Sequence, residues 1–132
     1  DTPKRRVEQR EQRIVAPGFG TRGASDARIQ GPDDINAANT SVMIVGDELW
    51  ALWEGGSPTR MDPRSLATLG VRPLRADLAG MPFTAHPKVE PNGRIWNLGV
   101  YGNRAIVWRL SADGAVEDAQ LLNLPSRSYI HD

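Results

Sequence analysis

The two histidines of this sequence, His86 and His131, are the side chains with the widest choice of chemistry, and they stand 45 positions apart. Neutral imidazole is a common ligand for transition metals. The chain has no cysteine, so carboxylates are the other candidate ligands or partners. Glu54 follows the apolar run LWALW at residues 49–53, where an ionised carboxylate is costly unless it is paired. Together the three residues could form a metal site in which a carboxylate orients an imidazole ring.

Simpler interpretations exist for the same residues. Two histidines in 132 residues also fit ordinary roles on a surface or in a core. Glu54 precedes a Gly-Gly turn and could end its strand in water. Pro87, in turn, favours the ligand interpretation slightly, because it restricts His86 to extended backbone geometry, which fits a strand edge rather than a helix. The choice between these interpretations depends on the secondary structure that holds the three side chains.

Short apolar runs separated by turn residues fill the chain from residue 39 onward, a pattern typical of β-strands. The first four expected strands lie at residues 41–45, 48–53, 59–61 and 66–71. The next four lie at residues 84–89, 94–100, 105–110 and 116–124. Gly46-Asp47 suits a two-residue hairpin between the first two strands, because glycine tolerates a positive φ. The pattern predicts two antiparallel meanders.

The two meanders begin 43 residues apart, at residues 41 and 84, which indicates a repeat. A period of about 40 to 45 residues with four strands per unit is typical of propeller blades, and a β-sandwich is the alternative. Residues 128–132 fit the opening of a third blade. The first strand of each blade lines the propeller axis, so His86 and His131 would point toward one central locus.

The first 35 residues form an N-terminal arm, ahead of blades expected at residues 36–132. Residues 4–13 predict a short helix with five basic side chains, and residues 16–34 predict a long loop. A nucleic-acid or lipid-headgroup patch is the functional interpretation of the helix. Glu8 and Glu11 interrupt the basic run and no aromatic residue interleaves, which favours a solvated face.

The composition limits the classes of partner and the cellular location that we expect for this chain. Sixteen basic residues balance sixteen acidic ones, so we expect no nucleic-acid partner, and the polar N-terminal region gives no evidence of peripheral membrane contact. No apolar run approaches the roughly 20 residues of a membrane span, and no signal peptide is recognisable, so we expect a cytoplasmic protein. Because the chain begins with Asp1 and stops just after an apolar-aromatic run, we also expect a fragment.

Five motifs in register make the sequence resemble the carotenoid cleavage oxygenase family, which includes apocarotenoid, lignostilbene and retinal pigment epithelial members. The motifs are ANTSV (38–42), LWALWEGG (49–56), MDP with LATLG (61–70), FTAHPK (83–88) and IHD (130–132). Each motif is weak alone, but their order and spacing match over residues 36–132. Residues 1–35 fit only loosely.

The resemblance implies an all-β, seven-bladed propeller with Fe(II) on its axis, bound by four histidines of which three are oriented by glutamates. His86 would be the first iron ligand and His131 the second, and Glu54 would be the orienting carboxylate with His131 as its expected partner. The remaining histidines and glutamates of the family pattern have no counterpart in this chain. We therefore expect about two blades and the start of a third, inactive alone.

The function that the resemblance implies is dioxygenation, in which O₂ cleaves a conjugated C=C bond of an apolar polyene into two carbonyl products. Lignostilbene-type members tend to carry a lysine just before this glutamate, whereas Trp53 stands here, which favours a carotenoid or apocarotenoid substrate. Trp53 also fits a plain core aromatic. A lignostilbene-type or phenylpropanoid alkene dioxygenase, or a non-catalytic β-repeat binding module, is the alternative function.

Overall fold

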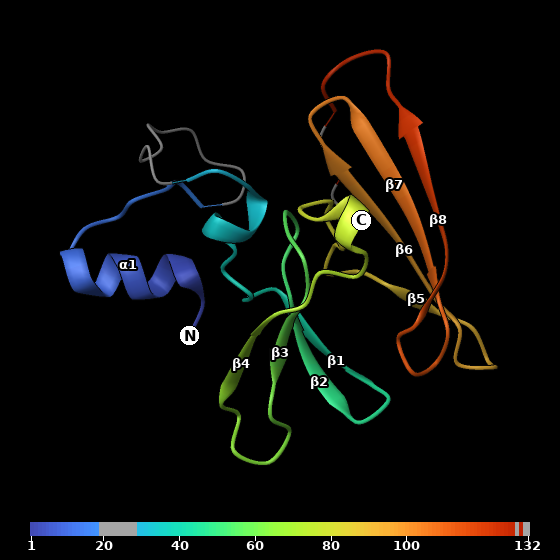
Figure 1. The fold of residues 1–132 in the computed structure, drawn as a ribbon, viewed down its shortest axis with the longest axis horizontal. Helices are drawn as coiled ribbons and strands as arrows, with labels where there is room; N and C mark the ends of the chain where they lie inside the picture. The colour runs from blue at the N-terminus through green and yellow to red at the C-terminus, as the bar shows by residue number, and fades with distance from the viewer. Residues whose placement is uncertain (19–28, 129, 131–132) are drawn as a thin grey trace.

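Two antiparallel four-stranded sheets, preceded by a helical N-terminal segment, make up the fold (Figure 1). The structure is a computed structural model that describes residues 1–18, 29–128 and 130. The first sheet has the strand order β1-β2-β3-β4 and the second has the order β5-β6-β7-β8. Every strand therefore pairs with its neighbours in sequence, as a meander requires.

The first sheet contains β1 (Ser41–Val45), β2 (Glu48–Leu52), β3 (Thr59–Met61) and β4 (Thr68–Val71). The second contains β5 (Lys88–Val89), β6 (Ile95–Tyr101), β7 (Arg104–Leu110) and β8 (Val116–Asn123). The described residues also form helix α1 (Pro3–Glu11) and the 3₁₀ helices η1 (Pro32–Ile35) and η2 (Ala76–Leu78). All eight expected strands are present, and β5 is the one whose bounds differ most.

The connection between β1 and β2 is the predicted two-residue hairpin. Val45 pairs with Glu48, which leaves only Gly46 and Asp47 in the turn. Gly46 has a φ of 56°, in the left-handed region that favours glycine. Local turn chemistry thus sets the register of the first hairpin.

The strand expected at residues 84–89 is shorter than predicted, because β5 begins only at Lys88. Pro87 has no N–H to give to a ladder. Upstream of it, the backbone N–H and C=O of Thr84 both bind the side chain of Asn97 instead of a neighbouring strand. The extended segment that carries His86 is therefore held by side chains before it joins the second sheet.

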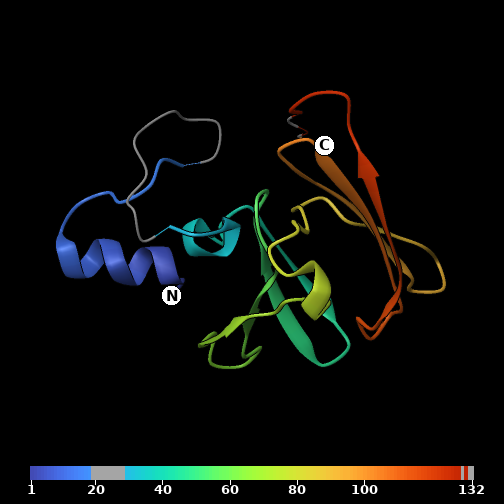
Figure 2. The ribbon, with the colours of Figure 1, turned by 45° about the horizontal axis from the view of Figure 1, so that its top comes forward.

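The hydrophobic core lies between the two sheets and uses residues from both. Its fully buried members include Trp50, Leu52, Phe83, Ile106, Trp108 and Leu110. The rings of Trp50 and Phe83 meet edge to face, with centroids 5.9 Å apart and an angle of 85° between their planes. Figure 2 shows the chain between β4 and β5, including η2, lying between the sheets. Only its last part, Pro82–Ala85, is buried, whereas η2 has no buried residue.

Helix α1 spans Pro3–Glu11, close to the expected residues 4–13, and its first turn is capped. The Thr2 side chain accepts a hydrogen bond from the N–H of Arg5, and Pro3 occupies the first helical position. Lys4 lies 2.6 Å from Glu8, one turn further along the helix. The acidic residues thus partner the basic ones, as a solvated helix face requires. No helix formed by the described residues is long and apolar enough to cross a membrane.

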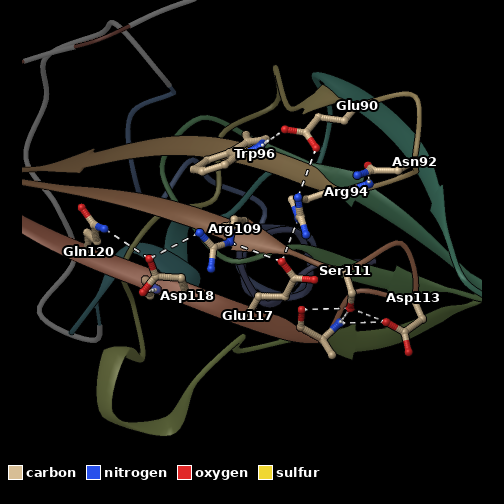
Figure 3. A network of polar contacts seen from close by, with 12 residues as sticks. Glu90, Asn92, Arg94, Trp96, Arg109, Ser111, Asp113, Glu117, Asp118 and Gln120 are labelled. Carbon is tan, nitrogen blue, oxygen red and sulfur yellow. Dashed lines mark hydrogen bonds and ion pairs between the residues drawn. The ribbon is translucent and has the colours of Figure 1, made fainter.

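A polar network covers one end of the second sheet (Figure 3). Glu90 accepts a hydrogen bond from the indole N–H of Trp96 at 2.8 Å, and this bond is the main cause of the lowered pKa of Glu90. Glu117 lies 2.9 Å from Arg94 and 3.3 Å from Arg109, and the Arg109 guanidinium lies over the Trp96 ring. These charged groups pair with one another and stabilise this end of the sheet.

The first sheet has a related arrangement at Glu48. This carboxylate accepts a 2.7 Å hydrogen bond from the indole of Trp50 and lies 3.2 Å from Arg60 and 3.0 Å from Arg72. Burial opposes ionisation of Glu48, but the bonds from Trp50 and Arg60 and the charge of Arg72 outweigh it and lower its pKa. Both sheets therefore tie a tryptophan of their second strand to an ionised glutamate.

Candidate metal centre

Glu54 and His86 meet where the two sheets face each other. Glu54 follows β2 in the first sheet, and His86 precedes β5 in the second. The Oε1 atom of Glu54 lies 3.0 Å from Nε2 of His86. The Glu54 side chain is only 2% exposed, whereas that of His86 is 30% exposed. The interpretation of Glu54 as a strand-end residue in water is therefore wrong.

The loop after β2 explains why Glu54 turns inward. Asp33 of η1 accepts hydrogen bonds from the backbone N–H and the hydroxyl of Ser57, at 2.7 and 2.9 Å. Asn36 donates to the carbonyl of Ser57 at 2.7 Å. A Cβ on Gly56 would lie 2.7 Å from an oxygen of Asp33, so only glycine fits there. The N-terminal segment thus anchors the loop that places Glu54 in the interior.

The segment before His86 passes between the sheets and is bound to both. The N–H of Phe83 donates to the carbonyl of Gly56 at 3.0 Å. The hydroxyl of Ser41, on the first sheet, donates to the carbonyl of Ala85 at 2.6 Å. The indole of Trp108, on the second, donates to the carbonyl of Pro82 at 2.8 Å. Residues far apart in sequence therefore fix the approach of His86 to Glu54.

The sequence motifs do not identify two of these positioning side chains, Ser41 and Asn97. Ser41 belongs to the ANTSV motif, where its hydroxyl looks like an ordinary strand residue. Asn97 is an amide inside the apolar strand β6, and it is only 5% exposed. A buried amide in a strand interior must find hydrogen-bond partners, and that signal alone could have singled out Asn97.

The arrangement suits a metal-bound imidazole. Neither carboxylate oxygen of Glu54 accepts an aligned hydrogen bond from the described residues, and Nε2 of His86 lies 3.0 Å from its Oε1. A buried carboxylate without a partner is costly. A carboxylate beside one ring nitrogen raises the basicity of the imidazole and fixes its orientation, while the other nitrogen can bind a metal. The residues present thus fit one histidine arm of a metal site.

A cavity of about 410 Å³ opens beside His86. Its walls are mostly apolar and include Trp96, Leu98, Val107 and Ile130. A second cavity of about 440 Å³ reaches Trp53 and Glu54 from the N-terminal segment. Apolar space therefore borders both members of the Glu54–His86 pair.

The second predicted ligand, His131, lies outside the described residues, as does most of the expected third-blade strand at 128–132. Its role as a ligand and its pairing with Glu54 stay predictions. Within the described ranges, no group of three histidine, cysteine, aspartate or glutamate side chains is close enough to bind a metal. The described residues accordingly supply one candidate ligand, His86, and its carboxylate neighbour.

A sequence model of the family described as "Retinal pigment epithelial membrane protein" matches residues 1–132. Apocarotenoid-15,15'-oxygenase from Synechocystis is 51% identical over 57 residues, which cover 42% of this chain and 12% of that protein. The match to the family therefore extends over the whole chain, including the N-terminal arm that the motifs fit only loosely.

Solved structures agree with the sequence comparison. The lignostilbene dioxygenase of Pseudomonas brassicacearum matches with a TM-score of 0.83 and 26% identity, over 100% of this chain and 28% of that one. A cobalt-substituted Synechocystis apocarotenoid oxygenase matches with a TM-score of 0.77 and 29% identity, over 99% of this chain and 30% of that one. The chain thus spans less than a third of these relatives, and the predicted partial propeller is confirmed.

Proposed function

This chain belongs to the retinal pigment epithelial membrane protein family of carotenoid and stilbene cleavage oxygenases, and on that premise we propose that the whole protein is a non-haem Fe(II) dioxygenase. The proposed substrate is a carotenoid or apocarotenoid. Both atoms of O₂ would enter the products: the conjugated C=C bond breaks, and each of its carbons becomes a carbonyl. Electrons balance without a further reductant.

The observation that carries the proposal is the buried contact between Glu54 and His86. His86 and His131 would hold the iron, and further ligands would come from parts of the protein outside this chain. Iron bound there would supply the activation of O₂. Glu54 would hold the N–H of a ligand imidazole and so keep its ring in one orientation.

The residues around the pair would also shape the environment of the reaction. Neutral imidazole ligands suit an apolar polyene that carries no charge. The cavity beside His86 is lined by apolar residues such as Leu98 and Val107. This lining would exclude water from a reactive carbon chain. Trp53 is 5% exposed and precedes Glu54, where a phenol-binding member would present a lysine. These features favour a polyene over a hydroxystilbene.

The experiment uses the whole protein with one apocarotenoid and one hydroxystilbene as substrates. We expect about one iron per chain, aldehyde products from the apocarotenoid, and loss of both iron and activity in His86→Ala. Iron at wild-type stoichiometry in that variant would refute the ligand assignment. Carbonyl products from the stilbene alone would favour the lignostilbene-type alternative, and no iron and no cleavage would favour a binding module.

A further inference from the structure

Asn97 is the buried side chain that ties the His86 segment to the second sheet. Its Oδ1 accepts a hydrogen bond from the N–H of Thr84 at 2.9 Å, and its Nδ2 donates to the carbonyl of Thr84 at 2.9 Å. Thr84 lies two residues before His86. A carboxamide carries an acceptor and a donor in one plane, like a backbone peptide group. Asn97 therefore takes the place of a neighbouring strand.

The local backbone needs such a partner. Thr84 is 8% exposed, so its N–H and C=O cannot rely on water. The ladder between β5 and β6 begins only at Lys88, which pairs with Trp96. Asn97 supplies the two bonds that the ladder does not provide. Without them the segment has a gap in its hydrogen bonding immediately before the histidine.

The other hydrogen bonds that hold the segment either lie further from the His86 ring or come from the first sheet and the loop after β2. Phe83 is bound to Gly56, and the Ala85 carbonyl is bound to Ser41. These bonds hold the segment against the first sheet. Asn97 alone among the described side chains binds both polar groups of one backbone residue there. Together with the Thr84 hydroxyl, which donates to the Leu98 carbonyl at 3.1 Å, it holds the His86 segment against β6.

From this geometry we propose that Asn97 is a positioning residue for the metal centre, which it serves by holding the backbone of Thr84 so that His86 faces Glu54. The inference rests on the proposed function, because it concerns His86 as a metal ligand. Asn97 also borders the cavity beside His86, so metal binding is measured in the absence of substrate. Its effect is transmitted by its two hydrogen bonds to Thr84. A substitution of Asn97 should therefore weaken metal binding without unfolding the protein.

The test measures the affinity of the whole, metal-stripped protein for Co²⁺ by titration, with visible absorption reporting the ligand geometry. Asn97→Asp retains the volume and the acceptor but removes the donor to the Thr84 carbonyl. We expect a 10- to 100-fold weaker affinity, about the loss typical of groups that orient a metal ligand, and an altered cobalt spectrum. Asn92→Asp is the matched control: it makes the same change at an exposed turn and keeps the side-chain oxygen that accepts from the N–H of Arg94, so cobalt binding should stay as in the wild type.

A double-mutant cycle separates positioning from general stability. In a His86→Ala background, Asn97→Asp should change the residual cobalt affinity by less than about two-fold, because its effect acts through His86. An equal loss in both backgrounds would overturn the inference, and so would wild-type affinity in Asn97→Asp. If Asn97→Asp does not fold, Asn97→Ser, which loses both bonds to Thr84, is measured in the same cycle. A wild-type protein that binds no cobalt would refute the proposed function, whereas cobalt binding unaffected by Asn97→Asp would refute only this inference.

Discussion

Gly99 of β6 lies against the backbone of the His86 segment, and we predict that Gly99→Ala destabilises the protein. A Cβ built on Gly99 would lie 2.0 Å from the carbonyl oxygen of Pro82 and 2.8 Å from its carbonyl carbon. Both atoms belong to the backbone, so no side chain can rotate to relieve the clash. The same carbonyl accepts the buried 2.8 Å bond from Trp108.

The magnitude follows from two contributions. Overpacking by a single methyl group costs about 1 to 3 kcal/mol when the surroundings cannot move. Displacing the Pro82 carbonyl also weakens its hydrogen bond with Trp108, which adds about 1 kcal/mol. We therefore expect a loss of about 2 to 4 kcal/mol in the free energy of unfolding. Because the displaced segment carries His86, the variant should also retain less iron.

The assay is urea unfolding of the whole protein followed by tryptophan fluorescence. A loss of this size lowers the urea midpoint by at least several tenths of a molar at a typical denaturant dependence. Gly31→Ala is the control, because a Cβ there has no atom within 4 Å and its φ is −161°. A Gly99→Ala midpoint equal to that of the control would show that the contact between Gly99 and the Pro82 carbonyl is looser than the structure indicates.

Three further predictions concern the groups around the pair. Glu54→Gln should weaken iron binding by about 10- to 100-fold in a metal titration without lowering the unfolding midpoint of the metal-free protein; unchanged affinity would contradict its orienting role. Ser41→Ala should cost about 1 kcal/mol in urea unfolding through the lost bond to Ala85, and a neutral result would discount that anchor. The pKa values of Glu48 and Glu90 are lowered in the folded protein, so both carboxylates stabilise it when they are ionised. This contribution to the free energy of unfolding should be complete above pH 4.5, the ordinary pKa of glutamate, and should decrease at lower pH as the carboxylates are protonated. Unfolding midpoints measured between pH 6 and pH 3 check this, and a rise on acidification would reverse the sign.

The strands of both sheets could be predicted because their signals are local. Apolar runs and turn residues such as Gly46-Asp47 specify a hairpin within a few positions, and the repeat of four runs specifies the blade. The start of β5 could not be predicted in this way. It depends on Asn97 binding a backbone residue 13 positions away, an interaction that competes with the strand ladder and leaves no local pattern.

Glu54 and His86 could be singled out from the sequence, but their contact could not, because the expected partner of Glu54 was His131. The position of Glu54 after an apolar run indicated that its carboxylate needs a partner. Its burial, however, depends on Asp33 binding Ser57 over 24 positions, which no motif expresses. The contact between Glu54 and His86 likewise requires both sheets to pack around Phe83. Long-range packing therefore decided what the residue types alone left open.

In the proposed site, His86 binds iron beside Glu54. The most direct measurement is a crystallographic anomalous-difference map of the whole protein, collected at the iron absorption edge. We predict a single strong peak in contact with a ring nitrogen of His86, with the Glu54 carboxylate close by. A protein that contains iron but shows its peak away from His86 would contradict the claim.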